Sequence, residues 1–190
     1  MTRDLKISLI IIGIIATLTF VVMALPFLHF LYLMGPPRQG FQETKEDFLL
    51  NKESILAVRD YFIRSGFESI SVHSTGEPGT AFAGLKYGRI LITDSKVSEA
   101  IATLHRNGYQ AISKSDNAVV FLRWTGFDVG KGVAYSIDGY VPYGDALLFL
   151  TWIEPLSIGG WYYYEANFDV WRMRNQQGLP TVEFPSGNSR

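Results

Sequence analysis

The chain has 190 residues, of which 47% are hydrophobic and 18% charged. This balance is typical of a folded protein and excludes a wholly disordered or a polytopic membrane chain. The formal net charge is −1, and basic and acidic residues are interspersed, whereas nucleic-acid-binding proteins carry a basic excess on one face. We therefore exclude a nucleic-acid partner. The chain has no cysteine, which excludes disulfides, thiolate nucleophiles and cysteine-bound metals.

An uncharged apolar segment, residues 7–25, follows a short N-terminus that contains Arg3 and Lys6. At ~1.5 Å rise per residue, a helix over this segment spans about 28 Å, which matches the hydrocarbon core of a bilayer. Apolar residues continue to position 34. We predict an N-terminal membrane anchor at 1–35, with a transmembrane helix at about 7–25 and lipid contact through 7–34.

A cleaved signal peptide is the alternative, because the small-residue pattern before Leu25 permits cleavage after Ala24. The apolar run extends well beyond that point, which favours an uncleaved signal-anchor. Positive residues preceding the span usually stay in the cytoplasm. We therefore expect a single-pass protein of the cell membrane whose domain lies outside the cytoplasm.

Residues 36–50, Pro-rich and then charged, are predicted to be a linker before a domain at 51–175. Apolar periodicity predicts a helix at 52–65 and a second at 95–106, the latter capped by Asp94 or Ser95. Asn167 is expected to cap a last short helix, and residues 176–190 are expected to form a loose tail.

Strands are predicted between and after these helices. Their expected ranges are 67–73, 89–93, 109–113, 118–124, 133–137, 147–153 and 160–164, with a loop at 74–80 and a hairpin turn at Asp138-Gly139. Helices near the front and a strand-rich second half indicate an α+β fold. We expect a mixed or antiparallel sheet with helices mainly on one face.

The histidines are few: His29 in the apolar segment, His73 at a strand end and His105 on the second helix. Their spacing matches no zinc motif, so we predict no metal and no cofactor. A triad of His73, Ser74 and Asp94 would need assembly by the fold, and neighbouring strand residues point to opposite faces. No catalytic residue is therefore assigned.

The most distinctive stretch is the aromatic run from Trp161 to Tyr164. Strand alternation places Trp161 and Tyr163 on one face and Tyr162 and Tyr164 on the other. We expect Trp161 and Tyr163 to be buried, because two glycines before Trp161 let the backbone close onto the core. Tyr162, Tyr164 and Trp171 then form a candidate binding surface for a protein, peptide or glycan, since such residues dominate interaction hot spots.

The anchor, the aromatic second half and the lack of a catalytic set favour a membrane-anchored, non-catalytic accessory or binding domain. Two alternatives stay open. One is an anchored hydrolase that uses His73 or His105 with nearby carboxylates. The other is a single-span accessory subunit of a larger membrane complex, whose helix would pack closely at Gly13 and Ala16.

Overall fold

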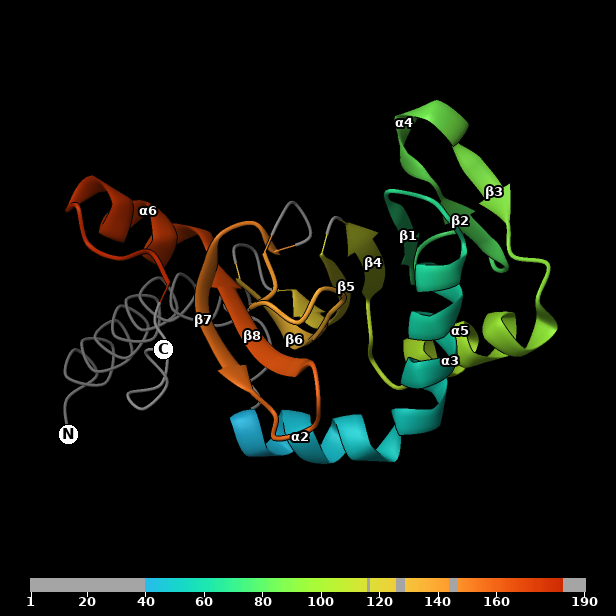
Figure 1. Cartoon of the computed structure of the whole chain (residues 1–190), viewed down its shortest axis with the longest axis horizontal. Coiled ribbons are helices and arrows are strands. Elements are labelled where there is room, and N and C mark those ends of the chain that lie inside the picture. The colour runs from blue at the N-terminus through green and yellow to red at the C-terminus, as the bar shows by residue number, and fades with distance from the viewer. Residues whose placement is uncertain (1–39, 116, 126–128, 144–146, 183–190) are drawn as a thin grey trace, which may run out of the picture. The chain divides into compact units, whose positions relative to one another are not determined.

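The computed structural model describes residues 40–115, 117–125, 129–143 and 147–182 (Figure 1). Within these residues, one antiparallel sheet has the strand order β3-β2-β1-β4-β5-β6-β8-β7. Its strands are β1 Ile70–His73, β2 Thr80–Phe82, β3 Arg89–Leu91, β4 Ala111–Ser115, β5 Ala118–Thr125, β6 Val129–Ser136, β7 Leu150–Pro155 and β8 Trp161–Asn167. The predicted α+β class with an antiparallel sheet is confirmed.

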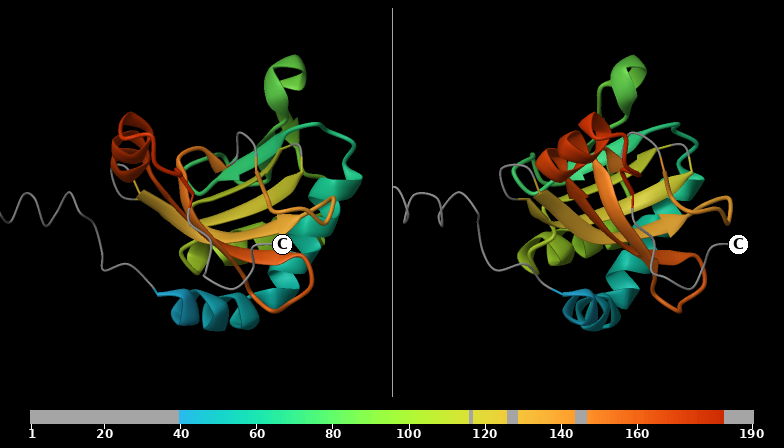
Figure 2. Two further views of the ribbon diagram at one scale, coloured as in Figure 1. Left: turned by 60° about the vertical axis from the view of Figure 1, so that its left-hand side comes forward. Right: turned by 90° about the vertical axis from the view of Figure 1, so that its left-hand side faces the viewer.

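The described helices are α2 Phe41–Leu50, α3 Lys52–Arg64, the single turn α4 Gly84–Tyr87, α5 Ser95–Arg106 and α6 Phe168–Gln176. The predicted caps of two of them are confirmed. Asp94 accepts hydrogen bonds from Lys96 N and Val97 N at the start of α5, and Asn167 Oδ1 accepts one from Val170 N at the start of α6. In Figure 2, α2 crosses beneath the twisted sheet and α6 projects from it.

The main core, called the helix-side core below, lies between one face of the sheet and helices α2, α3 and α5. Fully buried residues from each layer meet there, including Phe48 of α2, Phe62 of α3, Leu104 of α5, Phe121 of β5 and Trp161 of β8. The Trp161 ring lies 4.8 Å from that of Phe48 and 5.8 Å from that of Phe121. Arg59, on the apolar face of α3, stacks its guanidinium on Tyr135 at 4.7 Å and pairs with Asp60.

A second, smaller core covers part of the opposite face of the sheet. It contains Val120, Ala134 and Tyr164 from the central strands, together with Leu147 from the segment before β7 and the packed side chain of Val182. The sheet therefore separates two apolar clusters. Because Val182 completes one of them, at least part of the tail predicted at 176–190 is ordered against the domain.

The linker predicted at 36–50 is wrong from residue 41 onward, because α2 begins there and is part of the core. Its Phe48 is fully buried. Asp47 pairs with Arg123 of β5 and accepts a hydrogen bond from the Tyr109 hydroxyl at 2.9 Å. Burial, followed by the nearby Asp47 carboxylate, raises the pKa of Tyr109 far above its ordinary value. These contacts fix α2 to the sheet.

The hairpin turn predicted at Asp138-Gly139 is also wrong, because β6 pairs with β8 and not with the next strand in the sequence. Asp138 instead forms a local turn, in which its Oδ1 accepts hydrogen bonds from Tyr140 N and Ser136 Oγ. These hydrogen bonds, led by that from Tyr140 N, lower the pKa of Asp138. The chain then leaves the sheet and returns as edge strand β7.

Several other boundaries differ from the predictions, among them the starts of β1 at Ile70, β4 at Ala111 and β7 at Leu150. Thr80–Phe82 forms strand β2 and begins inside the predicted loop. Strand β6 begins at Val129, earlier than predicted, and β8 continues to Asn167. None of the helices in the described part of the chain is long and apolar enough to span a bilayer. The anchor predicted at 7–34 lies outside the described residues.

Candidate functional site

The aromatic strand β8 divides its side chains between the two faces as predicted. Trp161 and Tyr163 are each 2% exposed and belong to the helix-side core. Tyr164 belongs to the second core and is also 2% exposed, while Tyr162 packs beside it and is half-buried. Burial raises the pKa of Tyr164 far above its ordinary value. The strand is therefore structural on both faces over most of its length.

The three residues of the candidate binding surface do not form one exposed surface. The Tyr164 side chain is buried, because the segment before β7 covers the face that sequence reasoning left open. Trp171 of α6 is half-buried in a separate cluster, where its ring lies 5.3 Å from Phe149 and 6.4 Å from Phe168. This cluster attaches α6, which has no buried residue of its own, to the sheet.

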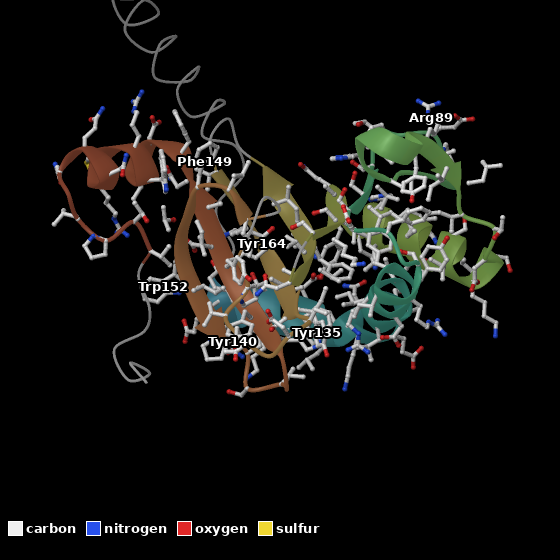
Figure 3. The ribbon with its side chains drawn as sticks, turned by 45° about the horizontal axis from the view of Figure 1, so that its top comes forward. Arg89, Tyr135, Tyr140, Phe149, Trp152 and Tyr164 are labelled. Atoms are coloured by element: carbon white, nitrogen blue, oxygen red, sulfur yellow. The ribbon has the colours of Figure 1, made fainter. Side chains whose placement is uncertain are left out.

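The structure contains a groove, the β7–β8 groove, on the helix side of the sheet between the start of α2 and α6. Its volume is about 370 Å³, and its lining residues are Phe41, Thr151, Trp152, Glu154, Tyr163, Glu165, Asn167, Val170 and Arg174. Trp152 lies on β7, the edge strand (Figure 3). Three aromatic rings, two carboxylates, one amide and one guanidinium thus converge on one depression.

Hydrogen bonds set the geometry of the two carboxylates. The Tyr163 hydroxyl donates to Glu165 Oε1, and Trp152 Nε1 donates to Glu154 Oε2 at 3.4 Å. On the neighbouring strand β6, Lys131 lies directly opposite Glu165 in register and is 2% exposed. Each carboxylate on the floor of the groove is thus hydrogen-bonded to an aromatic side chain of its own strand: Glu154 to Trp152, and Glu165 to Tyr163.

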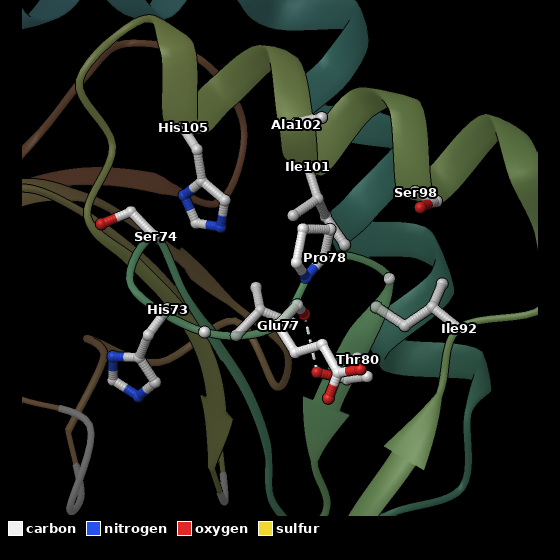
Figure 4. Close-up of a pocket in the computed structure, with 13 residues that line it drawn as sticks. His73, Ser74, Glu77, Pro78, Thr80, Ile92, Ser98, Ile101, Ala102 and His105 are labelled. Atoms are coloured by element: carbon white, nitrogen blue, oxygen red, sulfur yellow. Dashed lines mark hydrogen bonds between the residues drawn. The ribbon is translucent and has the colours of Figure 1, made fainter.

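A second depression, the α5 pocket, lies between α5 and the loop that follows β1. It has a volume of about 250 Å³, and His73, Ser74, Glu77 and His105 are among its lining residues. Figure 4 shows the His105 ring projecting from α5 toward the loop that carries Ser74 and Pro78. The fold thus brings both domain histidines and the neighbouring serine to one pocket.

These residues do not form a triad. Asp94 caps the N-terminus of α5, whereas His105 lies near its C-terminus, about 16 Å away along the helix. Glu77 pairs with Arg89 at 2.9 Å. His105 Nδ1 lies 2.8 Å from the carbonyl oxygen of Tyr109, and no hydrogen bond joins Ser74 to either histidine in the described structure. Within the described residues, no group of three or more His, Asp or Glu side chains is placed to hold a metal ion.

Sequence reasoning missed Trp152, Glu154 and Arg174 as site residues. The alternation Trp152-Ile153-Glu154 was visible, since it places the tryptophan and the carboxylate on one face of a strand. The pairing that sets this face beside Tyr163 and Glu165 depends on the register of β7 with β8, which shifts between Leu150 and Trp152. No local sequence signal specifies that shift.

Comparison with known proteins identifies no relative of this chain. No protein-family model, no curated protein and no solved structure matches the chain.

Proposed function

We propose that this protein is a membrane-anchored, non-catalytic binding domain whose β7–β8 groove holds a glycan. The observation that carries the proposal is the convergence of Trp152, Tyr163, Glu154, Glu165 and Arg174 on one depression of about 370 Å³. A volume of this size falls within the range of small-ligand sites, which combine apolar walls with a few placed polar groups.

The chemistry of the lining fits a polyhydroxylated ligand. The half-buried Trp152 ring offers a flat apolar face to the C–H face of a sugar ring and adds a polar edge, while Tyr163, which is 2% exposed, orients Glu165. Carboxylates accept hydrogen bonds from hydroxyl groups, while the Asn167 amide and the Arg174 guanidinium donate to hydroxyl oxygens. Both carboxylates already accept a bond from an aromatic neighbour, which orients them before a ligand arrives. Such orientation lowers the entropy cost of binding.

The anchored hydrolase is the second candidate, and one observation favours it: His73, Ser74 and His105 line the same pocket. Acyl transfer by serine requires a hydrogen-bonded base and an orienting group. The pocket supplies neither in the described structure, since Asp94 caps a helix end and Glu77 pairs with Arg89. We therefore favour the binding domain.

Binding by full-length protein in lipid nanodiscs tests the groove. Tetrasaccharides of glucose and of N-acetylglucosamine are suitable probes, measured by calorimetry. Trp152→Ala should weaken binding about tenfold or more, as expected for a central aromatic contact. Tyr140→Ala is the control, because Tyr140 is an aromatic residue that is 73% exposed and does not line the groove. An equal loss in both variants would contradict the assignment.

The charge of the groove is tested separately. Glu154→Gln keeps the shape of the side chain and should weaken binding, whereas Glu99→Gln, an identical change on the exposed face of α5, should not. Failure of every oligosaccharide to bind, with capture of a peptide through the same residues, would reject the glycan and retain the groove.

Membrane association is tested on the native protein. An uncleaved anchor should keep the full-length chain in the membrane fraction through high salt and an alkaline wash. Protease added to intact, wall-stripped cells should digest the domain if it lies outside the cytoplasm. Release of intact full-length chain by the wash would reject the anchor, and a mature chain beginning at Leu25 would establish the signal peptide.

A further inference from the structure

The α5 pocket has walls that the backbone fixes in place. Three hydrogen bonds hold the loop after β1: Ser74 N to Gln110 O at 2.8 Å, Gly76 N to His73 O at 2.9 Å, and Ile92 N to Gly79 O at 2.8 Å. A Cβ on Gly76 would lie 3.0 Å from His73 O, and Gly79 has φ +74°. The loop therefore depends on glycine at these positions, and the pocket is formed before any ligand enters.

The interior of this pocket is largely apolar. Val72, Ile92 and Ile101 contribute buried side chains, and Pro78 and Ala102 complete the wall. Its volume of about 250 Å³ is below the ~300–1,000 Å³ of sites for drug-sized ligands. A molecule of about one ring with short substituents fits such a space.

His105 gives the pocket one directed polar group. Its Nδ1 lies 2.8 Å from the Tyr109 carbonyl oxygen. A carbonyl oxygen only accepts hydrogen bonds, so Nδ1 carries the proton and the Nε2 atom of the neutral ring is an acceptor. Within the described residues nothing donates to Nε2. A ligand that satisfies this atom must supply an O–H or N–H group.

The charges around the pocket favour a neutral ligand. No Lys or Arg is among the described residues that line it, and the carboxylate of Glu77 is held by Arg89. An anion would find no fixed cation here, and a cation would compete with Arg89 for Glu77. The remaining hydroxyl groups, on Ser74 and Ser98, are neutral.

We propose that the α5 pocket binds a small neutral aromatic alcohol or phenol, whose ring lies against Val72, Ile92 and Ile101 and whose hydroxyl donates to His105 Nε2. This site is separate from the β7–β8 groove: the two share no lining residue. It does not depend on the glycan or on the anchor.

The test uses full-length protein in detergent micelles with phenol as the probe and toluene as its matched partner without a hydroxyl group. Phenol should bind about tenfold more tightly than toluene, the difference expected for one hydrogen bond in an apolar site. Phenol should also shift the ¹⁵N resonance of His105 Nε2, and toluene should not. Equal affinity for the two probes, or an unchanged Nε2 resonance, would overturn the proposal.

Variants assign the binding to this pocket. His105→Phe should abolish the preference for phenol, while His73→Phe should retain it, because His73 carries no bond that orients its ring in the described structure. Ala102→Trp, at an exposed position on the rim, should fill the pocket and abolish binding of both probes without disturbing the core. Trp152→Ala should leave phenol binding unchanged. Undiminished phenol binding in Ala102→Trp would place the probe elsewhere and reject the site.

Discussion

Gly132 in β6 allows close approach to strand β5. It lies opposite Leu122, where the register of the two strands shifts. A Cβ at this position would overlap the carbonyl oxygen of Phe121, and would lie 3.0 Å from its carbonyl carbon and 3.3 Å from Leu122 Cα. Because these are backbone atoms, no side-chain rotation relieves the overlap, and the strands must separate or the register must change.

We therefore expect Gly132→Ala to lower the free energy of unfolding by about 3 kcal/mol, the upper part of the range for overpacked interiors. For a domain of this size, a loss of about 3 kcal/mol lowers Tm by about 6–12 °C. Tryptophan fluorescence during heating reports on the domain, since all 4 tryptophans lie after residue 120.

Gly159→Ala is the control. Gly159 has no atom within 4 Å of its added Cβ and no positive φ, so its Tm should stay within about 1–2 °C of the native protein, as for a neutral surface change. If Gly132→Ala also melted within 2 °C of the native protein, the close approach of β5 and β6 would be wrong.

Three further changes test the core. Trp161→Ala should cost about 3–5 kcal/mol, measured by denaturant unfolding, because it empties the centre of the helix-side core. Asp47→Ala should cost about 3 kcal/mol, since it leaves the Arg123 guanidinium and the Tyr109 hydroxyl without their shared partner. The pKa values of Tyr109 and Tyr164 are raised in the folded protein, so both hydroxyl groups stay protonated there above pH 10, whereas they ionise in the unfolded chain. The free energy of unfolding should therefore be constant with respect to these groups below pH 10, and should fall above pH 10 by up to about 1.4 kcal/mol per pH unit for each group. Tyr164→Phe should halve this alkaline loss, and an unchanged slope would contradict its burial.

Local sequence patterns were sufficient to predict helices α3 and α5 and the two faces of strand β8. Helix α5 combines a capping aspartate, Asp94, with four apolar residues at helical spacing, and α3 has the same kind of apolar face. The faces of β8 followed from strand alternation alone. In each case the residues that specify the element lie within a few positions of one another.

Other features depend on contacts between distant residues. Helix α2 places only Phe48 and Thr44 in buried positions, and its Leu49 and Leu50 are exposed, so it shows no regular apolar face and resembles a linker until Asp47 meets Arg123 and Tyr109. The β7–β8 groove likewise requires the pairing of β7 with β8 and the position of α6. The burial of Tyr164 was missed because the segment that covers it precedes β7 and shows no periodic pattern.

The two edges of the sheet are poor templates for another chain. β3 is only three residues long and begins with the exposed Arg89, and β7 contains a register shift and ends at Pro155. Arg174 from α6 also donates to the carbonyl oxygen of Thr151 at 3.4 Å, which occupies a backbone acceptor of this edge strand. Short, irregular or covered edges discourage pairing between sheets of neighbouring molecules. Two molecules that meet edge to edge at high concentration therefore encounter short, irregular or covered strands, and such encounters do not grow into intermolecular sheets.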